Sequence, residues 1–330
     1  MSNFKKNNLI WLLLDDRAGN CSQVLGIGEA LNLKYIKKIF QYNLLSKLPN
    51  ILLQNTIKHI KTKDREQFKG PWPKVVIGCG RKSAPIGLWI KKKSNNYSKY
   101  VQIMWPSYPS SKLDIIFTPL HDNIKNKNNV IEIQTSPNII NHKLIHDSHT
   151  KWKTKFATFD KPKVSVIIGG DTKTHKLSVL HIKNLFKYIY KLTNNKGSIM
   201  ITSSRRTSRE CIKQIKKEVK KLKIKSIFWD INDKTPNPYY GFLAHGDLVV
   251  VTGDSVSICS EVCSTGKPLL IYAPKDITLK KHDIFHKLLI KKGIAKYLED
   301  FKIQDLNNFT YKPINEAENI AKIIKNKYLI

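Results

Sequence analysis

The chain has 330 residues, 41% of them hydrophobic and 9% aromatic, which is enough apolar material for globular cores and excludes a chain that is disordered as a whole. Its length suits two domains of about 150 residues better than one. The 58 basic and 25 acidic residues leave a formal net charge of +33, a balance that suits a polyanionic partner.

Lysine supplies most of this charge. Lysine, asparagine and isoleucine are abundant together, as AT-rich genomes produce, so we interpret most lysines as solvated surface residues. The chain has no RNA- or DNA-binding motif, and we expect no specific nucleic-acid partner. An anionic membrane surface remains an alternative partner. The arginines number only six: Arg17, Arg65, Arg81, Arg205, Arg206 and Arg209.

Five of these arginines fall in or beside predicted strand-to-helix loops. A guanidinium forms a planar fork that pairs with phosphate through two hydrogen bonds and keeps its proton. Arg17, Arg81, Arg205 and Arg206 are therefore candidate ligand-binding residues.

Neither a membrane span nor a metal site is expected. The N-terminal apolar run at 9–14 ends at Asp15 and Asp16, far short of the length of a signal or membrane segment. The cysteines lack the C-x-x-C spacing of zinc sites, so we expect reduced thiols and no cofactor. These features predict a cytoplasmic protein, with peripheral attachment to a membrane as the alternative. The five cysteines are Cys21, Cys79, Cys211, Cys259 and Cys263.

Apolar runs alternate with helical patterns along the first half. The run at 9–14 predicts a buried strand, followed by a loop and an amphipathic helix at 22–31. The same strand-loop-helix order begins again at 74–85. Further strands are expected at 100–105, 114–118 and 129–133. Residues 135–162 are polar without sustained periodicity, so we expect an N-terminal domain over 1–150 and a linker at 151–162.

The second half, 163–330, repeats the alternation. Because strands that alternate with helices form parallel sheets covered on both faces, the chain is predicted to be an α/β protein of two Rossmann-like domains that face each other across a cleft. A final helical pattern at 314–328 is typical of a helix that packs back on the first domain. Strands are expected at 164–168, 198–202, 225–229, 247–252 and 268–272, and helices at 175–193, 208–221 and 256–265.

Three loops of the second half concentrate groups that bind anions. Gly169 and Gly170 follow a strand and could let backbone N–H groups approach a diphosphate, although a plain tight turn fits equally well. The segment TSSRRTSR at 202–209 adds hydroxyls and two arginines, with helix capping and solvated arginines as the alternative.

The third loop, TGDSVSICSEVCSTGKP at 252–268, is the most specific of the three. It places Asp254, Ser255 and Ser257 at the start of a short helix whose only charged residue is Glu261. A carboxylate in this position can accept hydrogen bonds from the hydroxyls of a ribose. The alternative is an exposed glutamate on a helix surface.

These motifs, read in order, resemble the plant mitochondrial-fission "elongated mitochondria" family and its bacterial relatives, which in turn are similar to GT-B glycosyltransferases such as the transferase that adds N-acetylglucosamine to the lipid-linked peptidoglycan precursor. The resemblance covers nearly the whole chain. It is carried by DDRAGNCSQVLGIGEAL at 15–31, VVIGCGRKSAP at 75–85, FTPLHD at 117–122, VIIGGDTK, ITSSRRT and NPYYGFLAHGDLVVVTGDSVSICSEVCSTGKPLLIY.

The resemblance implies roles for individual residues. Glu261, with Gly266 and Pro268, would bind the ribose of a nucleotide donor, and the loop with Asp254, Ser255 and Ser257 would face its diphosphate. Gly169 and Gly170 correspond to the glycine loop that opens the second domain. The first loop would face the acceptor through Asp16, Arg17, Gly19 and Asn20.

The chain departs from the family pattern at Asn20, where relatives commonly carry histidine. Because an amide cannot accept a proton at neutral pH, a general base must come from elsewhere. Asp16 is one candidate, and His121 oriented by Asp122 is the other, unless these two form an ordinary surface pair. The sequence therefore predicts a metal-independent GT-B-like glycosyltransferase that uses a nucleotide-diphosphate sugar, or else a non-catalytic scaffold at a membrane surface.

Overall fold

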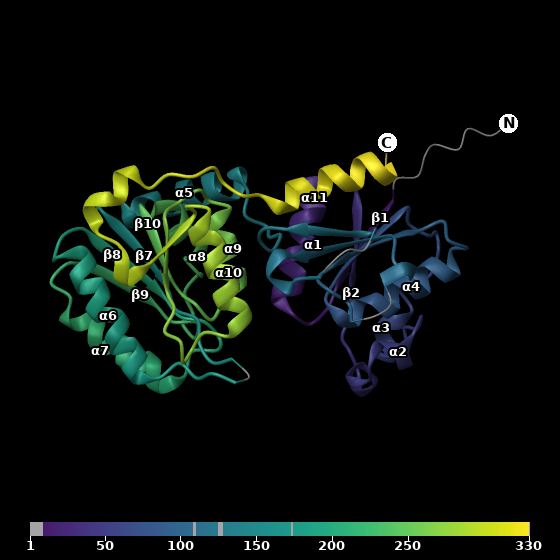
Figure 1. The fold of residues 1–330 in the computed structure, drawn as a ribbon, viewed down its shortest axis with the longest axis horizontal. Coiled ribbons are helices and arrows are strands. Elements are labelled where there is room, and N and C mark those ends of the chain that lie inside the picture. Colours follow the sequence, from purple (N-terminus) through teal and green to yellow (C-terminus); the bar gives the residue numbers. More distant parts are fainter. Residues whose placement is uncertain (1–8, 108–109, 125–127, 173, 330) are drawn as a thin grey trace. The chain divides into compact units, whose positions relative to one another are not determined.

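The computed structural model describes residues 9–107, 110–124, 128–172 and 174–329. The chain forms two compact units, one from Met1–Ile139 with Asn315–Ile330 and the other from Ile140–Ile314. Each unit is built on a six-stranded sheet in which every pair of neighbouring strands is parallel. The predicted class, two Rossmann-like parallel-sheet domains, is confirmed (Figure 1).

The sheet of the N-terminal unit has the order β2-β1-β3-β4-β5-β6. Its strands are β1 (Ile10–Leu14), β2 (Tyr35–Ile39), β3 (Val75–Cys79), β4 (Lys99–Ile103), β5 (Ile115–Pro119) and β6 (Val130–Ile133). Its α-helices are α1 (Ala18–Leu31), α2 (Asn50–Leu53), α3 (Thr62–Arg65), α4 (Ala84–Lys93) and α11 (Glu316–Ile324), with shorter helical turns η1 (Leu44–Lys47), η2 (Arg81–Ser83), η3 (Ser110–Lys112), η4 (Leu120–Asp122) and η7 (Lys325–Leu329).

The sheet of the C-terminal unit has the order β12-β11-β10-β7-β8-β9. Its strands are β7 (Lys163–Ile167), β8 (Ser198–Thr202), β9 (Lys225–Trp229), β10 (Leu248–Thr252), β11 (Leu269–Tyr272) and β12 (Ala295–Tyr297). Its helices are α5 (His142–Phe156), α6 (Val179–Thr193), α7 (Arg209–Lys221), α8 (Tyr239–His245), α9 (Val256–Cys263), α10 (Lys280–Lys291), η5 (Leu298–Asp300) and η6 (Ile303–Asn308).

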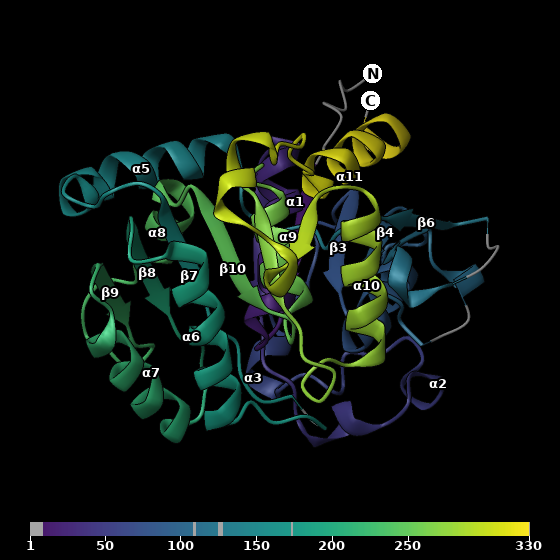
Figure 2. The same ribbon diagram turned by 60° about the vertical axis from the view of Figure 1, so that its left-hand side comes forward.

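Helices cover both faces of the C-terminal sheet, as Figure 2 shows from a second side. Side chains of α6 and α7 pack on one face with Val164, Val166 and Val250. Side chains of α9 and α10 pack on the opposite face with Val249 and Val251. Strand β10 is buried along its whole length, because a strand covered on both faces needs apolar residues at every position.

The boundary between the units differs from the predicted linker. Residues 142–156 form α5, which belongs to the C-terminal unit and packs against α8. Phe156 is fully buried with Phe242, 5.7 Å between ring centroids. The helix was missed because its first turns are polar and histidine-rich, so few apolar residues mark its periodicity. The chain changes units at 139–140, ahead of the expected junction.

The last helix, α11, belongs to the N-terminal unit and packs on α1. Ile320 and Ile324 are fully buried in the same cluster as Val24 and Ile27. Glu316 fixes the start of the helix, since its Oε1 accepts a hydrogen bond of 2.8 Å from the backbone N–H of Gln134. In the part of the chain that the structure describes, no helix has the length and apolar character needed to cross a bilayer.

Candidate functional site

Three polar loops leave the middle of the C-terminal sheet at the carboxyl ends of β7, β8 and β10. The chain winds from β7 outward to β8 and β9, then returns to the other side of β7 with β10. The strand order therefore reverses between β7 and β10. Open α/β sheets bind ligands at such a switch point, because the loops on its two sides diverge there.

Asp254, which follows β10, organises this edge of the sheet. It is only 5% exposed. Its Oδ2 accepts hydrogen bonds from the backbone N–H of Gly170 (3.0 Å) and from the guanidinium of Arg206 (2.7 Å). Its Oδ1 accepts the hydroxyl of Thr252 at 2.6 Å. One buried carboxylate thus joins the loops of all three strands.

Gly169 and Gly170 are required by this packing. A Cβ on Gly169 would lie 2.2 Å from Oδ2 of Asp254, and one on Gly170 would lie 2.1 Å from the carbonyl of Arg206. Their N–H groups already donate to Thr252 and Asp254. The glycines therefore allow backbone segments to approach each other closely. Their N–H groups bind Thr252 and Asp254 and are not free to hold a diphosphate in the way that the sequence had suggested.

The two adjacent arginines have different surroundings. Arg206 donates to the carbonyls of Gly170 (3.2 Å) and Asp171 (2.9 Å) as well as to Asp254, so it clamps the β7 and β8 loops together. The side chain of Arg205 is exposed. Ser208 caps α7 by accepting from the N–H of Cys211. Among the groups of this loop, Arg205 keeps a guanidinium that can turn toward a ligand.

Helix α9 begins at the same edge of the sheet. Ser255 is its N-cap and accepts a hydrogen bond from the backbone N–H of Ile258, while Ser257 is exposed in the first turn. The N-terminus of a helix carries partial positive charge and unpaired N–H groups, which favour an anion. Gly266, beyond the helix, has a φ of +73°, which favours glycine.

Glu261 lies six residues beyond Ser255, about 9 Å along the helix axis. The hydroxyl of Tyr239 on α8 donates a hydrogen bond to its Oε2. Burial raises the pKa of Glu261 to about 7, and the hydrogen bond from Tyr239 opposes this rise. Burial, followed by the charge of Glu261, raises the pKa of Tyr240 to about 12. Glu261 is therefore half-buried and hydrogen-bonded to Tyr239, and it is not the exposed helix-surface glutamate of the alternative interpretation.

The raised pKa makes the stability of the C-terminal unit depend on pH. Between its ordinary value of 4.5 and about 7, Glu261 is protonated in the folded chain and ionised in the unfolded chain. Unfolding then releases a proton, so we expect the free energy of unfolding to fall as the pH rises through this window and to level off above it. Urea unfolding across the pH series, compared with Glu261→Gln, measures this contribution. A constant difference between the two proteins would contradict it.

In the N-terminal unit, the loop after β1 is organised by Asp15, a residue that the sequence pattern marked only as the end of an apolar run. Asp15 is buried, and it accepts hydrogen bonds from the backbone N–H of Arg17 (3.0 Å) and the amide of Asn20 (2.9 Å). Burial raises the pKa of Asp15, and these two bonds oppose the rise. Asp15 is the first polar residue after a fully buried strand, and this position alone could have identified it as a candidate site residue.

Asn20 thus acts as a bridge between loops. The same amide lies 3.4 Å from the carbonyl of Cys79 at the end of β3. Asp16 and Arg17 are exposed beside it, and a Cβ on Gly19 would meet no atom within 4 Å. The loop therefore presents two charged side chains to solvent while Asp15 and Asn20 hold its backbone.

Arg81 and the His121–Asp122 pair depart from their expected roles. The guanidinium of Arg81 donates to the carbonyls of Leu48 (2.7 Å) and Ser46 (2.9 Å), so it braces the segment after β2. His121 is buried, and its Nε2 lies 3.9 Å from Oδ1 of Asp122, too far for the hydrogen bond by which Asp122 would orient it. His121 follows β5, three strands or about 14 Å across the sheet from β1.

Two solved structures share this architecture. The chain superposes on MurG from Acinetobacter baumannii with a TM-score of 0.53 at 12% identity, covering 96% of this chain and 99% of that one. It superposes on the UDP-GlcNAc 2-epimerase of Methanocaldococcus jannaschii with a TM-score of 0.57 at 14% identity and the same coverage. That epimerase has also been solved in complex with UDP-GlcNAc and UDP. The fold is therefore GT-B-like.

Sequence relatives are found in bacteria and plants. The chain is 32% identical over 352 residues to the protein named "Uncharacterized protein RP120" of Rickettsia prowazekii, covering 96% of this chain and 97% of the relative. It is 28% identical over 297 residues to the mitochondrial fission protein ELM1 of Arabidopsis thaliana, covering 83% of this chain and 68% of the relative. The family model described as "Mitochondrial fission ELM1" matches residues 18–328. Because the family model matches most of the chain and the bacterial relative is similar over nearly its whole length, the chain belongs to the mitochondrial fission ELM1 family.

Proposed function

We propose that the C-terminal unit binds a nucleotide-diphosphate sugar and that the chain is a metal-independent, GT-B-like glycosyltransferase. The observation that carries this proposal is the arrangement of α9, whose Ser255-capped start lies at the switch point of the sheet and whose second turn holds the Tyr239-bonded carboxyl of Glu261. An anion-binding helix start and a hydroxyl-binding carboxylate about 9 Å apart suit the diphosphate and the ribose of one ligand.

In this proposal Glu261 accepts hydrogen bonds from the two ribose hydroxyls. These hydroxyls replace the hydroxyl of Tyr239, which donates to Glu261 in the structure. Ser255, Ser257 and the first N–H groups of α9 receive the diphosphate, and Arg205 turns toward it. Arg206 and Gly170 act indirectly, because the hydrogen bonds that they donate to Asp254 hold the three loops together. Gly169 contributes in the same way through the hydrogen bond that its backbone N–H donates to Thr252. The UDP-GlcNAc complex of the epimerase supports a UDP-linked sugar as the first ligand to test.

Transfer of the sugar leaves negative charge on the departing diphosphate. Fixed donors aimed at this charge stabilise the transition state, and the start of α9 with Arg205 supplies them without a metal ion. On the acceptor side, Asp16 is our proposed general base, since it is exposed beside Arg17 and Gly19 on the β1 loop. His121 is the second candidate for this proton transfer, although its ring nitrogen lies 3.9 Å from the Asp122 carboxylate, too far to donate a hydrogen bond to it.

A second candidate function is binding without turnover, as in a scaffold at a membrane surface. It is favoured by Asn20, which stands where the resemblance to the family implies a histidine and whose amide here donates to Asp15. A GT-B frame can keep its ligand site after losing its base, because fold does not determine activity.

Two measurements on the intact chain separate these functions. Calorimetric titration with UDP-, GDP-, ADP- and CMP-linked sugars is expected to show saturable binding of at least one donor, and failure of all of them would defeat the nucleotide-sugar proposal. Donor hydrolysis is then assayed with the sugar that binds. We expect slow turnover that Asp16→Asn abolishes, whereas binding without any turnover would favour the scaffold.

A further inference from the structure

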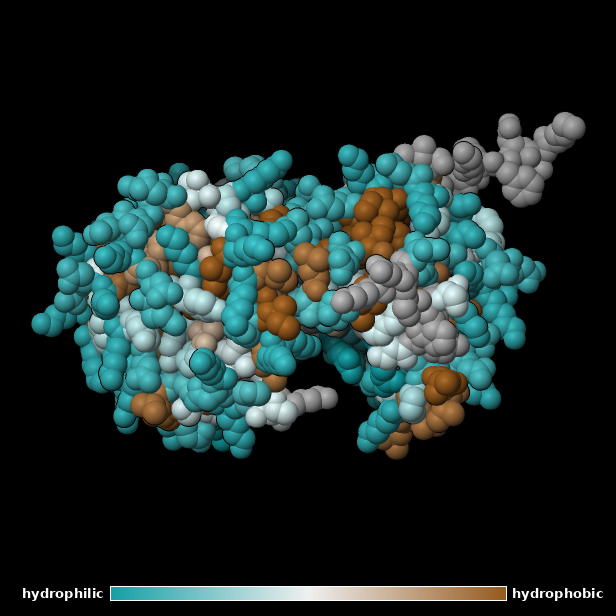
Figure 3. Space-filling view, in the orientation of Figure 1, coloured by the Kyte–Doolittle hydropathy of each residue, from teal (hydrophilic) through white to brown (hydrophobic). Residues whose placement is uncertain are grey.

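The segment between β2 and α3 exposes an unusual number of aliphatic side chains. Within 44–52, which spans η1 and most of α2, five leucine or isoleucine residues are exposed, with Leu44 at 78% and Leu52 at 66%. Figure 3 shows the resulting apolar cluster at the lower right, over the place where Figure 1 draws α2. We call this cluster the aliphatic tip. Its members are Leu44, Leu45, Leu48, Ile51 and Leu52.

Buried polar groups hold the tip in this shape. Asn43 caps η1, and Arg81 donates to the carbonyls of Ser46 and Leu48. The amide of Asn50, which is 1% exposed, donates to the carbonyls of Arg81 (2.7 Å) and Pro106 (2.8 Å). The backbone of the tip is therefore fixed to the body of the unit while its aliphatic side chains point outward. Contiguous exposed apolar surface of this kind marks an interaction site.

The surroundings of the tip are basic. The sequence has no acidic residue between Glu29 and Asp64. Lys82 reaches the base of the tip, with its Nζ 2.8 Å from the hydroxyl of Ser46. The exposed lysines of this stretch are Lys34, Lys37, Lys47, Lys58, Lys61 and Lys63.

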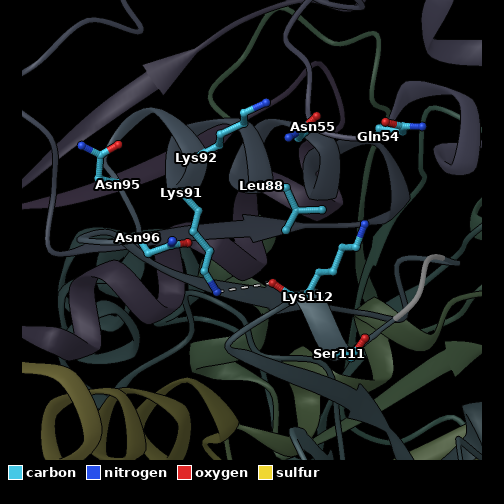
Figure 4. A pocket seen from close by; sticks show the side chains of 9 residues that line it. All are labelled: Gln54, Asn55, Leu88, Lys91, Lys92, Asn95, Asn96, Ser111 and Lys112. Atoms are coloured by element: carbon cyan, nitrogen blue, oxygen red, sulfur yellow. Dashed lines mark hydrogen bonds between the residues drawn. The ribbon is translucent and has the colours of Figure 1, made fainter.

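A basic pocket of about 550 Å³ adjoins the tip (Figure 4). Gln54 and Asn55, the residues that follow α2, lie on one side of it. The other residues that line it are Leu88, Lys91, Lys92, Asn95, Asn96, Ser111 and Lys112. Lys91 is partly neutralised by Asp114 at 2.9 Å. Lys92 lines the pocket and is exposed to solvent. The pocket is wide enough and polar enough to accept a phosphate group.

We propose that the aliphatic tip and this pocket dock the chain on a bilayer that contains anionic phospholipids. The five side chains enter the boundary between headgroups and acyl chains, while the lysines attract the anionic surface and the pocket receives a lipid phosphate. A membrane suits this surface better than a protein partner does, because all five members of the tip are aliphatic, whereas the residues that dominate protein interfaces are aromatic or arginine. The inference is independent of the nucleotide-sugar site, which lies in the other unit.

Cosedimentation of the full chain with vesicles tests this proposal. We expect binding to vesicles of phosphatidylcholine mixed with phosphatidylglycerol, and much weaker binding to phosphatidylcholine alone. Leu52→Asp should lower the partition coefficient about tenfold, because an aliphatic side chain is lost from the apolar boundary. Lys92→Glu should lower it at least about fivefold.

The chain offers matched controls in the other unit. Leu180 on α6 is 63% exposed, close to Leu52, so Leu180→Asp is expected to leave binding unchanged. Lys217→Glu on α7 is the control for Lys92→Glu. Equal losses for Leu52→Asp and Leu180→Asp, or no binding of the wild-type chain to anionic vesicles, would overturn the proposal. Concentration-dependent dimerisation that Leu52→Asp abolishes, without vesicle binding, would assign the surface to a second copy and overturn it as well.

Discussion

Replacing Asp254 with alanine is expected to lower the free energy of unfolding of the C-terminal unit by about 3 kcal/mol, because it removes the two hydrogen bonds that the buried Gly170 and Thr252 donate to this carboxylate, worth about 1.5 kcal/mol each. The substitution leaves the backbone N–H of Gly170 and the hydroxyl of Thr252 without their acceptor in a buried place. Arg206 loses its ion pair but can still be hydrated, since its side chain is 41% exposed. The midpoint of urea unfolding, followed by tryptophan fluorescence, measures the loss.

Asp283 provides the control for this prediction. It forms an exposed i, i+4 ion pair with Lys287 on α10, and such surface pairs contribute about 0–1 kcal/mol. Asp283→Ala should therefore change the midpoint little, and Asp254→Asn, which keeps one acceptor oxygen, should fall between the two. If Asp254→Ala were as mild as Asp283→Ala, Asp254 would not be the residue that joins the three loops.

Replacing Glu261 with glutamine is expected to weaken binding of the nucleotide-sugar between about tenfold and 150-fold, since hydrogen bonds to a charged group contribute about 1.5–3 kcal/mol each. Glutamine has nearly the same shape, so the pocket remains while the charged acceptor for the ribose hydroxyls is lost. Because burial raises the pKa of Glu261 to about 7, the affinity of the wild-type chain should also increase as the pH rises through 7. Calorimetric titration at several pH values measures both effects.

Two variants make this result specific. Glu299→Ala removes an exposed carboxylate from the same unit and should leave the affinity unchanged. Tyr239→Phe removes the hydroxyl that occupies Glu261 in the absence of ligand, and it should preserve or improve binding. Equal affinity of the wild-type chain and Glu261→Gln would exclude Glu261 from the ligand site.

Much of the fold can be predicted from the local pattern of apolar and polar residues. Strands β1, β3, β7, β8 and β10 were predicted because each is a short apolar run followed at once by glycine or polar residues. Strand β2 was missed because Lys37 and Lys38 interrupt its apolar pattern at the edge of the sheet. Helix α10 escaped because lysines and histidines surround its buried residues, Phe285 and Leu289.

The candidate site was predictable in outline and less so in its details. The loops with Gly169, Arg206 and Asp254 all follow strands, and parallel strands bring their carboxyl ends to one edge of the sheet. Whether a polar group in these loops is free or already paired depends on which loop lies beside it. Arg81 and Arg206 have similar sequence surroundings to Arg205, yet both are engaged with backbone carbonyls.

The sequence by itself determined the α/β class, the positions of most buried strands and the family, because a strand buried on both faces is a run of consecutive apolar residues and the motifs that resemble the family follow one another along the chain. Tertiary structure alone decided that Asp254 pairs with Arg206 across 48 positions, that Tyr239 holds Glu261, and that α11 packs on α1 in the N-terminal unit. These contacts follow from the order of strands in each sheet and from the path of the chain between units, and no local pattern of residues encodes either one.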